Sequence, residues 1–213
     1  GAHAAFTLSD ESLALCAGLM QQHDSGIHIH LAEDICDVKE SREKYHKAVV
    51  NRLYDAGALN SKSIVAHGVH LNRDELRQLN DIGCWLVHNP RSNMNNSVGY
   101  FSLQDALPIL ARCALGTDGI GANMFEEAKF AFFKAQDADK PIGAEACVDL
   151  LTGGHRLASE IFQCSIGSLE PGAAADVIVL DYPTPTPLHA GNLAWHLIFG
   201  ITHAQVESVM VNG

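Results

Sequence analysis

The stretch HIHLAED, residues 28–34, places two histidines and an acid close together. His28 and His30 lie on the same face of a strand, because side chains alternate along a strand with a period of two. Glu33 joins His30 only if the chain turns after Leu31. Two interpretations are therefore open: one corner of a metal site, or a strand that happens to carry polar residues.

Three further apolar segments end on residues of the same kinds. SIVAHG ends at His67, CWLVHNPRSN carries His88 with Asn93 in the following loop, and CALGTDG ends at Asp118. A single histidine at a strand end is most often structural. Four segments in a row that deliver His, Glu or Asp at their last positions are hard to explain by packing, and they indicate a shared site.

Metal-assisted hydrolysis is the chemistry that suits these side chains. Neutral imidazole and carboxylate groups are ligands that zinc and iron accept, and a bound metal acidifies water. A nearby carboxylate can then move a proton to the leaving group, and a histidine that does not bind the metal can orient water or polarise the substrate. His30, Glu33, His67 and Asp118 have the right types, but spacing alone leaves their individual roles open.

The elements that position these residues follow a regular alternation of strand and helix. Each of the four apolar segments is typical of a strand of four to six residues. Helices are expected at 10–23 after an N-cap at Ser9, 37–56, 73–82 after an N-cap at Asn72, 102–111 with a kink or restart at Pro108, 124–138 and 143–162. This alternation predicts a parallel α/β sheet, whose carboxyl ends meet on one edge.

The chain changes character near residue 165. The segment IGSLEPGAAADVIVLDYPTPTP contains a Gly/Pro turn, an apolar strand and a proline-rich extended stretch. We therefore expect two domains, at residues 1–164 and 165–213, the second of them rich in β-structure.

Composition and charge exclude several classes of protein. The 213 residues are 47% hydrophobic and 18% charged, which indicates a globular chain, and the net charge of −11 disfavours nucleic acids and anionic membranes. No apolar run is long enough to span a membrane, and GAHAAFTLSD lacks the features of a signal peptide. The six cysteines are scattered, as expected for reduced thiols. These features predict a cytoplasmic protein.

Six segments together resemble the metal-dependent amidohydrolase superfamily. They are HAAFTLSD, HIHLAED, VAHGVHL, VHNPRSNMNNSVG, LGTDGIGANMFEE and IGSLEPGAAADVIVLD, in family order and spread over nearly the whole chain. The resemblance is to the branch that contains guanine and cytosine deaminases, adenosine-type deaminases of thio- or homocysteine nucleosides, and triazine chlorohydrolases. It implies a partial (β/α)8 TIM barrel, about strands 4 to 8, followed by part of a small β-sandwich.

The resemblance also implies roles for the residues at the strand ends. His30 would be a metal ligand on the fifth barrel strand, Glu33 the proton shuttle, His67 the group that orients water or substrate, and Asp118 both a ligand and a base. Substrate contacts would come from His3, His88 and Asn93. The cofactor would be one divalent metal, with zinc expected before iron.

The family's first two metal ligands form an HxH pair on the first barrel strand, and this pair has no counterpart here. We therefore expect the segment to be incomplete by itself. The expected activity is hydrolysis of a non-peptide carbon–nitrogen bond, as in the deamination of an aminated heterocycle. Alternatives are a hydrolytic dehalogenase, a cyclic amidase or a non-catalytic truncated remnant. The expected partners are a small heterocyclic substrate and further copies of the chain, with neither nucleic acid nor membrane.

Overall fold

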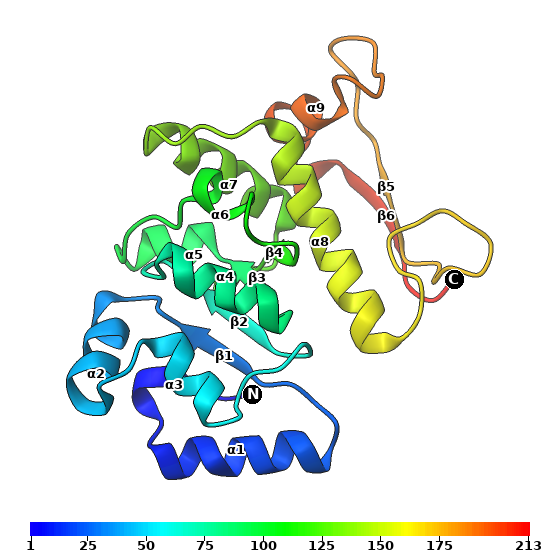
Figure 1. The fold of residues 1–213 in the computed structure, drawn as a ribbon. Helices are drawn as coiled ribbons and strands as arrows, with labels where there is room; N and C mark the ends of the chain where they lie inside the picture. The colour runs from blue at the N-terminus through cyan, green and yellow to red at the C-terminus, as the bar shows by residue number, and fades with distance from the viewer.

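A parallel four-stranded sheet forms the centre of the computed structural model, which describes residues 1–213. Strands β1 (His28–Leu31), β2 (Ile64–His67), β3 (Trp85–His88) and β4 (Cys113–Leu115) lie side by side in chain order (Figure 1). The predicted parallel α/β sheet is confirmed. Strand β4 has three residues and is shorter than predicted.

The register of the sheet brings the carboxyl ends of its strands to one edge. Leu31 lies opposite His67, and His88 lies opposite Leu115. On the other side of β1, Ala4 forms an isolated parallel bridge with His30. The chain start and the ends of all four strands therefore meet at the same edge, although they are far apart in the sequence.

Most of the predicted helices are present, and their starts follow local capping. Helix α1 (Asp10–Gln22) is capped by Ser9, whose hydroxyl accepts from the Ser12 amide at 3.2 Å. Helix α4 (Arg73–Ile82) is capped by Asn72. Both caps satisfy backbone donors that have no partner inside the helix. Helices α7 (Met124–Asp137) and α8 (Ala144–Phe162) also agree with the prediction.

Two predicted helices are wrong in extent. The helix expected at 37–56 is two helices, α2 (Ile35–Tyr45) and α3 (Val49–Asp55). They are separated because His46 has a left-handed backbone conformation, with φ of +54°, which ends α2. The helix expected at 102–111 is only one turn, α6 (Leu103–Ala106), because Pro108 has no N–H to bond the carbonyl oxygen of Gln104.

A short helix also replaces an expected loop after β3. Helix α5 (Pro90–Asn95) begins with a proline, which is well suited to the first helical position because its missing N–H has no partner there. Asn93, expected in a loop, is therefore a buried residue on a helix.

Helix α8 packs closely against β4 and closes one side of the core. A Cβ atom built on Gly153 would lie 2.2 Å from the carbonyl oxygen of Cys113, so the helix approaches the strand as closely as only glycine allows. Trp85 on β3 donates its indole N–H to Glu160 of the same helix at 2.9 Å. The helix is thereby held across two strands.

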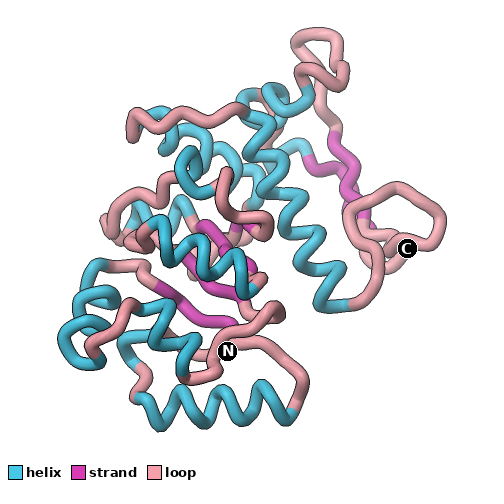
Figure 2. The backbone as a smooth tube through the Cα atoms, viewed as in Figure 1, coloured by secondary structure: helices cyan, strands magenta, loops and turns pink.

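The carboxyl-terminal residues form a separate antiparallel pair, β5 (Val177–Leu180) and β6 (Val206–Met210), joined through helix α9 (Leu193–Phe199) (Figure 2). Short 3-10 turns lie at Ala5–Thr7 and His203–Gln205. The β-structure expected in this part of the chain is present, and the division at residues 164 and 165 stays a prediction. No helix has the length and apolar character needed to cross a membrane.

Candidate active site

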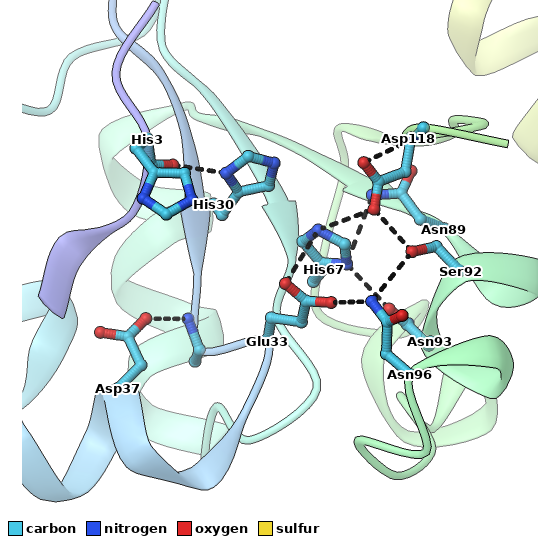
Figure 3. A network of polar contacts seen from close by, with 12 residues as sticks. His3, His30, Glu33, Asp37, His67, Asn89, Ser92, Asn93, Asn96 and Asp118 are labelled. Carbon is cyan, nitrogen blue, oxygen red and sulfur yellow. Dashed lines mark hydrogen bonds and ion pairs between the residues drawn. The ribbon is translucent and has the colours of Figure 1, made fainter. Parts of the chain in front are cut away.

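Three side chains converge at the carboxyl edge of the sheet. Glu33 follows β1, His67 ends β2 and Asp118 follows β4, and one ligand atom of each lies within 4.8 Å of the others. The His67 Nε2 atom lies 3.7 Å from Glu33 Oε2 and 3.7 Å from Asp118 Oδ2 (Figure 3). The imidazole is fully buried, whereas the carboxylates are 27% and 26% exposed. The site therefore has a buried imidazole and two carboxylates that solvent can reach.

Unusual backbone geometry aims these side chains at one point. His67 has φ of +74° and Asp118 has φ of +51°, and Ala32, which precedes Glu33, has φ of +49°. Residues other than glycine rarely adopt this left-handed region, and such strain is concentrated at functional sites. The turn after Leu31 that the sequence argument required is present.

Asp118 is held by donors that favour its ionised form. The Ser92 hydroxyl donates to Asp118 Oδ2 at 2.6 Å, and the Gly119 amide donates to Oδ1 at 2.7 Å. Partial burial acts to raise the pKa of Asp118, but these bonds and the nearby His67 outweigh it and hold the pKa below its ordinary value. Asp118 is therefore a carboxylate near neutral pH, able to bind a cation or accept a proton.

His67 and Glu33 are held by α5, the same short helix that carries Ser92. The Asn93 side-chain oxygen accepts from His67 Nδ1 at 2.8 Å, and the Asn96 side-chain nitrogen donates to Glu33 Oε1 at 2.9 Å. Ser92, Asn93 and Asn96 all belong to α5 or directly follow it (Figure 3). One helix therefore contacts all three converging side chains.

The arrangement fits a divalent metal ion. In the neutral tautomer that donates from Nδ1 to Asn93, the His67 ring presents an unprotonated Nε2 to two carboxylate oxygens. This Nε2 atom is buried and has no hydrogen-bond partner in the protein. Electron-rich atoms that face one another favour a cation at this edge of the sheet, and imidazole with carboxylate is a donor set that zinc and iron accept.

His30 lies beside this group but outside it. Its ring centroid is 5.3 Å from that of His67, and its Nδ1 atom contacts the His3 carbonyl oxygen, which leaves Nε2 free. The His3 ring lies at the exposed side, with its Nδ1 atom 3.2 Å from the Thr7 hydroxyl. Both histidines therefore flank the site on the side of β1, as Figure 3 shows.

His88 and Asn93, expected to contact substrate, are buried beneath the site. Their residues are 1% and 2% exposed, and both His88 ring nitrogens lack a hydrogen-bond partner. Burial, followed by the nearby His67, lowers the pKa of His88 to about 3, so this ring is neutral. It packs against Phe101, with ring centroids 5.3 Å apart. Their substrate contacts stay a prediction.

Sequence reasoning missed Ser92 and Asn96. The signal available was the proline at position 90, which is typical of the first residue of a helix. On a helix, positions 92 and 96 share one face because they are four residues apart. The expected loop would not place these two positions on a common face.

The chain belongs to the amidohydrolase family, whose model matches residues 1–213. It is 34% identical over its whole length to a 5-methylthioadenosine/S-adenosylhomocysteine deaminase from Caldanaerobacter subterraneus subsp. tengcongensis, and covers 51% of that protein. A second enzyme of that name, from Thermococcus sibiricus, is 32% identical, again with 100% of this chain and 51% of the relative covered. The chain thus spans about half the length of these relatives.

Solved structures have the same fold. An adenosine deaminase from Xanthomonas campestris with bound zinc superposes with a TM-score of 0.89 at 27% identity, over 99% of this chain and 49% of that one. Guanine deaminase from E. coli superposes with a TM-score of 0.86 at 23% identity, over 99% of this chain and 52% of that one. The fold resembles that of amidohydrolase TIM-barrel proteins, and the suspected family is confirmed.

Proposed function

We propose that this chain carries the carboxyl-terminal part of a metal-dependent aminohydrolase that deaminates an aminated heterocycle. The observation that carries the proposal is the convergence of Glu33, His67 and Asp118, with a buried, unpartnered Nε2 between two carboxylates. The deaminase names of the relatives support the reaction class. In this proposal residues 1–164 form about strands 4 to 8 of a barrel, and 165–213 begin a β-sandwich.

His30 and Asp118 are the proposed metal ligands within this chain. The free Nε2 of His30 and the ionised carboxylate of Asp118 both lie beside His67. Zinc is proposed before iron, supported by the zinc bound in the Xanthomonas enzyme. When bound, such an ion acts as a Lewis acid and makes water acidic enough to attack near neutral pH.

Glu33 is the proposed proton shuttle. Asn96 holds its Oε1 atom, so that Oε2 stays directed toward His67 and is available to take a proton from the attacking water. The water oxygen bonds to the ring carbon while Glu33 takes one water proton and delivers it to the adjacent ring nitrogen. His67 orients the reacting groups through Nε2. Asp118 takes the remaining hydroxyl proton and passes it to the amino nitrogen, the bond from the ring carbon to that nitrogen breaks, and ammonia leaves a ring carbonyl.

Substrate binding is proposed at a small cavity beside His30 and Glu33. It has a volume of about 180 Å³ and is bordered by His30, Glu33 and Asn96, with Phe6 and Val98 as apolar walls. An apolar wall opposite a few polar groups suits a planar heterocycle. A homo-oligomeric, cytoplasmic enzyme is part of the same proposal.

The test is ammonia release by the complete natural protein loaded with zinc. Adenosine-type nucleosides, guanine, cytosine and an aminotriazine are offered beside a chlorotriazine and a cyclic amide. We expect deamination of at least one amino-substituted ring, and a loss of activity of about 10²- to 10⁴-fold in Glu33→Gln. Glu40→Gln on the exposed face of α2 is the control. Reaction with the chlorotriazine or cyclic amide alone would contradict the deaminase proposal.

A further inference from the structure

We propose that Asn93 is a positioning residue for the reaction: its side-chain oxygen holds His67 with a proton on Nδ1 and thereby directs Nε2 at Glu33 and Asp118. This inference rests on the proposed function and assigns Asn93 a task different from the expected substrate contact. It concerns residues of this chain alone. Its structural basis is the 2.8 Å contact between the Asn93 oxygen and the His67 ring.

Burial makes this contact effective. His67 is 0% exposed and Asn93 is 2% exposed, so water does not compete for the hydrogen bond between them. A hydrogen bond in such surroundings is strong, and its loss leaves a polar group buried without a partner. Which ring nitrogen carries the proton is decided by the bond that the other nitrogen makes. In the neutral ring, a buried oxygen at Nδ1, closer to it than the Asn89 nitrogen at 3.5 Å, therefore leaves a lone pair at Nε2.

The helix that carries Asn93 is itself firmly held. Arg91, two residues before Asn93, pairs with the buried Glu127 at 2.5 Å and with Glu126 at 2.8 Å. The same helix delivers Ser92 to Asp118. Because α5 is anchored to α7, the Asn93 oxygen has little freedom to follow a rotated His67 ring. Asn93 is therefore carried by a firmly held helix, as a precisely arranged site requires.

The buried location of Asn93 separates this role from substrate binding. A side chain that touches substrate affects KM, whereas one that orients a reacting group affects mainly kcat. Residues that hydrogen-bond to a side chain of the site, without touching metal or substrate, change metal affinity or activity by about 10- to 100-fold when they are removed. We therefore expect Asn93→Leu, which keeps the approximate volume but removes the acceptor, to lower kcat by that factor with KM little changed.

The first experiment measures which nitrogen of the His67 ring carries a proton. The complete protein is labelled with nitrogen-15 at histidine, and the His67 signals are assigned by their loss in His67→Gln. Spectra are recorded with zinc and without it, and no substrate is needed. We expect the chemical shift of a protonated nitrogen at Nδ1 in both samples. An unprotonated Nδ1 would show that the asparagine donates instead, and would overturn the proposal.

Three variants then separate positioning from folding. Asn93→Asp retains an oxygen acceptor and is expected to restore the Nδ1 signal and most of kcat, whereas Asn93→Leu loses both. Asn80→Leu is the matched control, because the Asn80 oxygen accepts from the Ala111 amide at 3.0 Å outside the site. That control removes a structural hydrogen bond but leaves the His67 signals unchanged. If Asn93→Leu has the parent His67 spectrum and only a raised KM, the proposal is wrong.

The proposed function and the positioning by Asn93 are contradicted by different results. If the parent protein deaminates no heterocycle but His67 carries a proton on Nδ1 that is lost in Asn93→Leu, the proposed function is wrong and the positioning is right. If deamination occurs and Nδ1 is unprotonated, the positioning is wrong and the proposed function stands.

Discussion

The guanidinium group of Arg91 lies 2.5 Å from the carboxylate of Glu127, whose side chain is completely buried. Arg91 lies on α5 and Glu127 in the first turn of α7, so the pair joins the helix that contacts the site to the helix that follows Asp118. Arg91 also donates to the Gly121 carbonyl at 2.6 Å. The loop after Asp118 is therefore tied to the helix that carries Ser92.

Removal of the Glu127 charge is expected to destabilise the protein strongly. Glu127→Gln leaves the Arg91 charge, whose side chain is 10% exposed, with only its partly exposed partner Glu126, and breaking a buried pair costs about 3–5 kcal/mol. Urea denaturation of the complete protein measures the change. Glu126→Gln is the control, because its side chain is 42% exposed and such pairs contribute about 1 kcal/mol or less. Equal losses in both variants would contradict this account.

Loss of a proposed ligand is expected to remove the metal. His30→Ala and Asp118→Asn should each reduce the zinc or iron content of the complete protein to a small fraction, because each removes a donor beside the same cluster. Elemental analysis measures the content, and His23→Ala at the exposed end of α1 is the control. A folded parent protein without metal would instead favour the non-catalytic remnant.

Asp37 is expected to make the stability depend on pH. Burial raises its pKa from 3.8 to about 6, although the hydrogen bond from the Ala32 amide and the Arg52 charge act in the opposite direction. The folded pKa is therefore above the unfolded value. The resulting stabilisation is fully present below the unfolded pKa and is lost as the pH rises through the folded one.

The expected size of this effect is about 3 kcal/mol between about pH 4 and pH 7. Asp37→Asn removes the titrating group, while its side-chain oxygen can still accept from the Ala32 amide, as Asp37 does at 2.6 Å. Urea denaturation at a series of pH values should show the parent losing stability relative to the variant as pH rises. Parallel curves for the two proteins would contradict the prediction.

Substitution of two neighbouring glycines on α8 by alanine is expected to change the stability of the protein in opposite directions. A Cβ atom at Gly153 would meet the Cys113 carbonyl at 2.2 Å, so Gly153→Ala should push α8 away from β4 and cost about 1–3 kcal/mol. Gly154 has no heavy atom within 4 Å of its Cβ position, so Gly154→Ala should stabilise the helix by about 0.5–1 kcal/mol. Thermal unfolding of the two variants tests both signs.

Local features of the sequence determined much of the framework. The period-two strands and the caps at Ser9 and Asn72 were predicted correctly, because they depend on neighbouring residues only. The break at His46 was not predicted, because a left-handed backbone at a residue other than glycine is specified by its surroundings. The short helix α5 was missed for a similar reason, since six residues are too few to show a helical period.

By itself the sequence determined the residue types of the site and the edge of the sheet at which they gather. His30 and Glu33 lie on or just after β1, His67 ends β2 and Asp118 follows β4, and parallel strands place their carboxyl ends together. Only the tertiary structure decided which of them meet, because their directions depend on strained backbone angles and on packing between distant segments. It also decided that Asn93 lies buried against His67, since burial is set by all the elements packed around a residue and not by its neighbours in sequence.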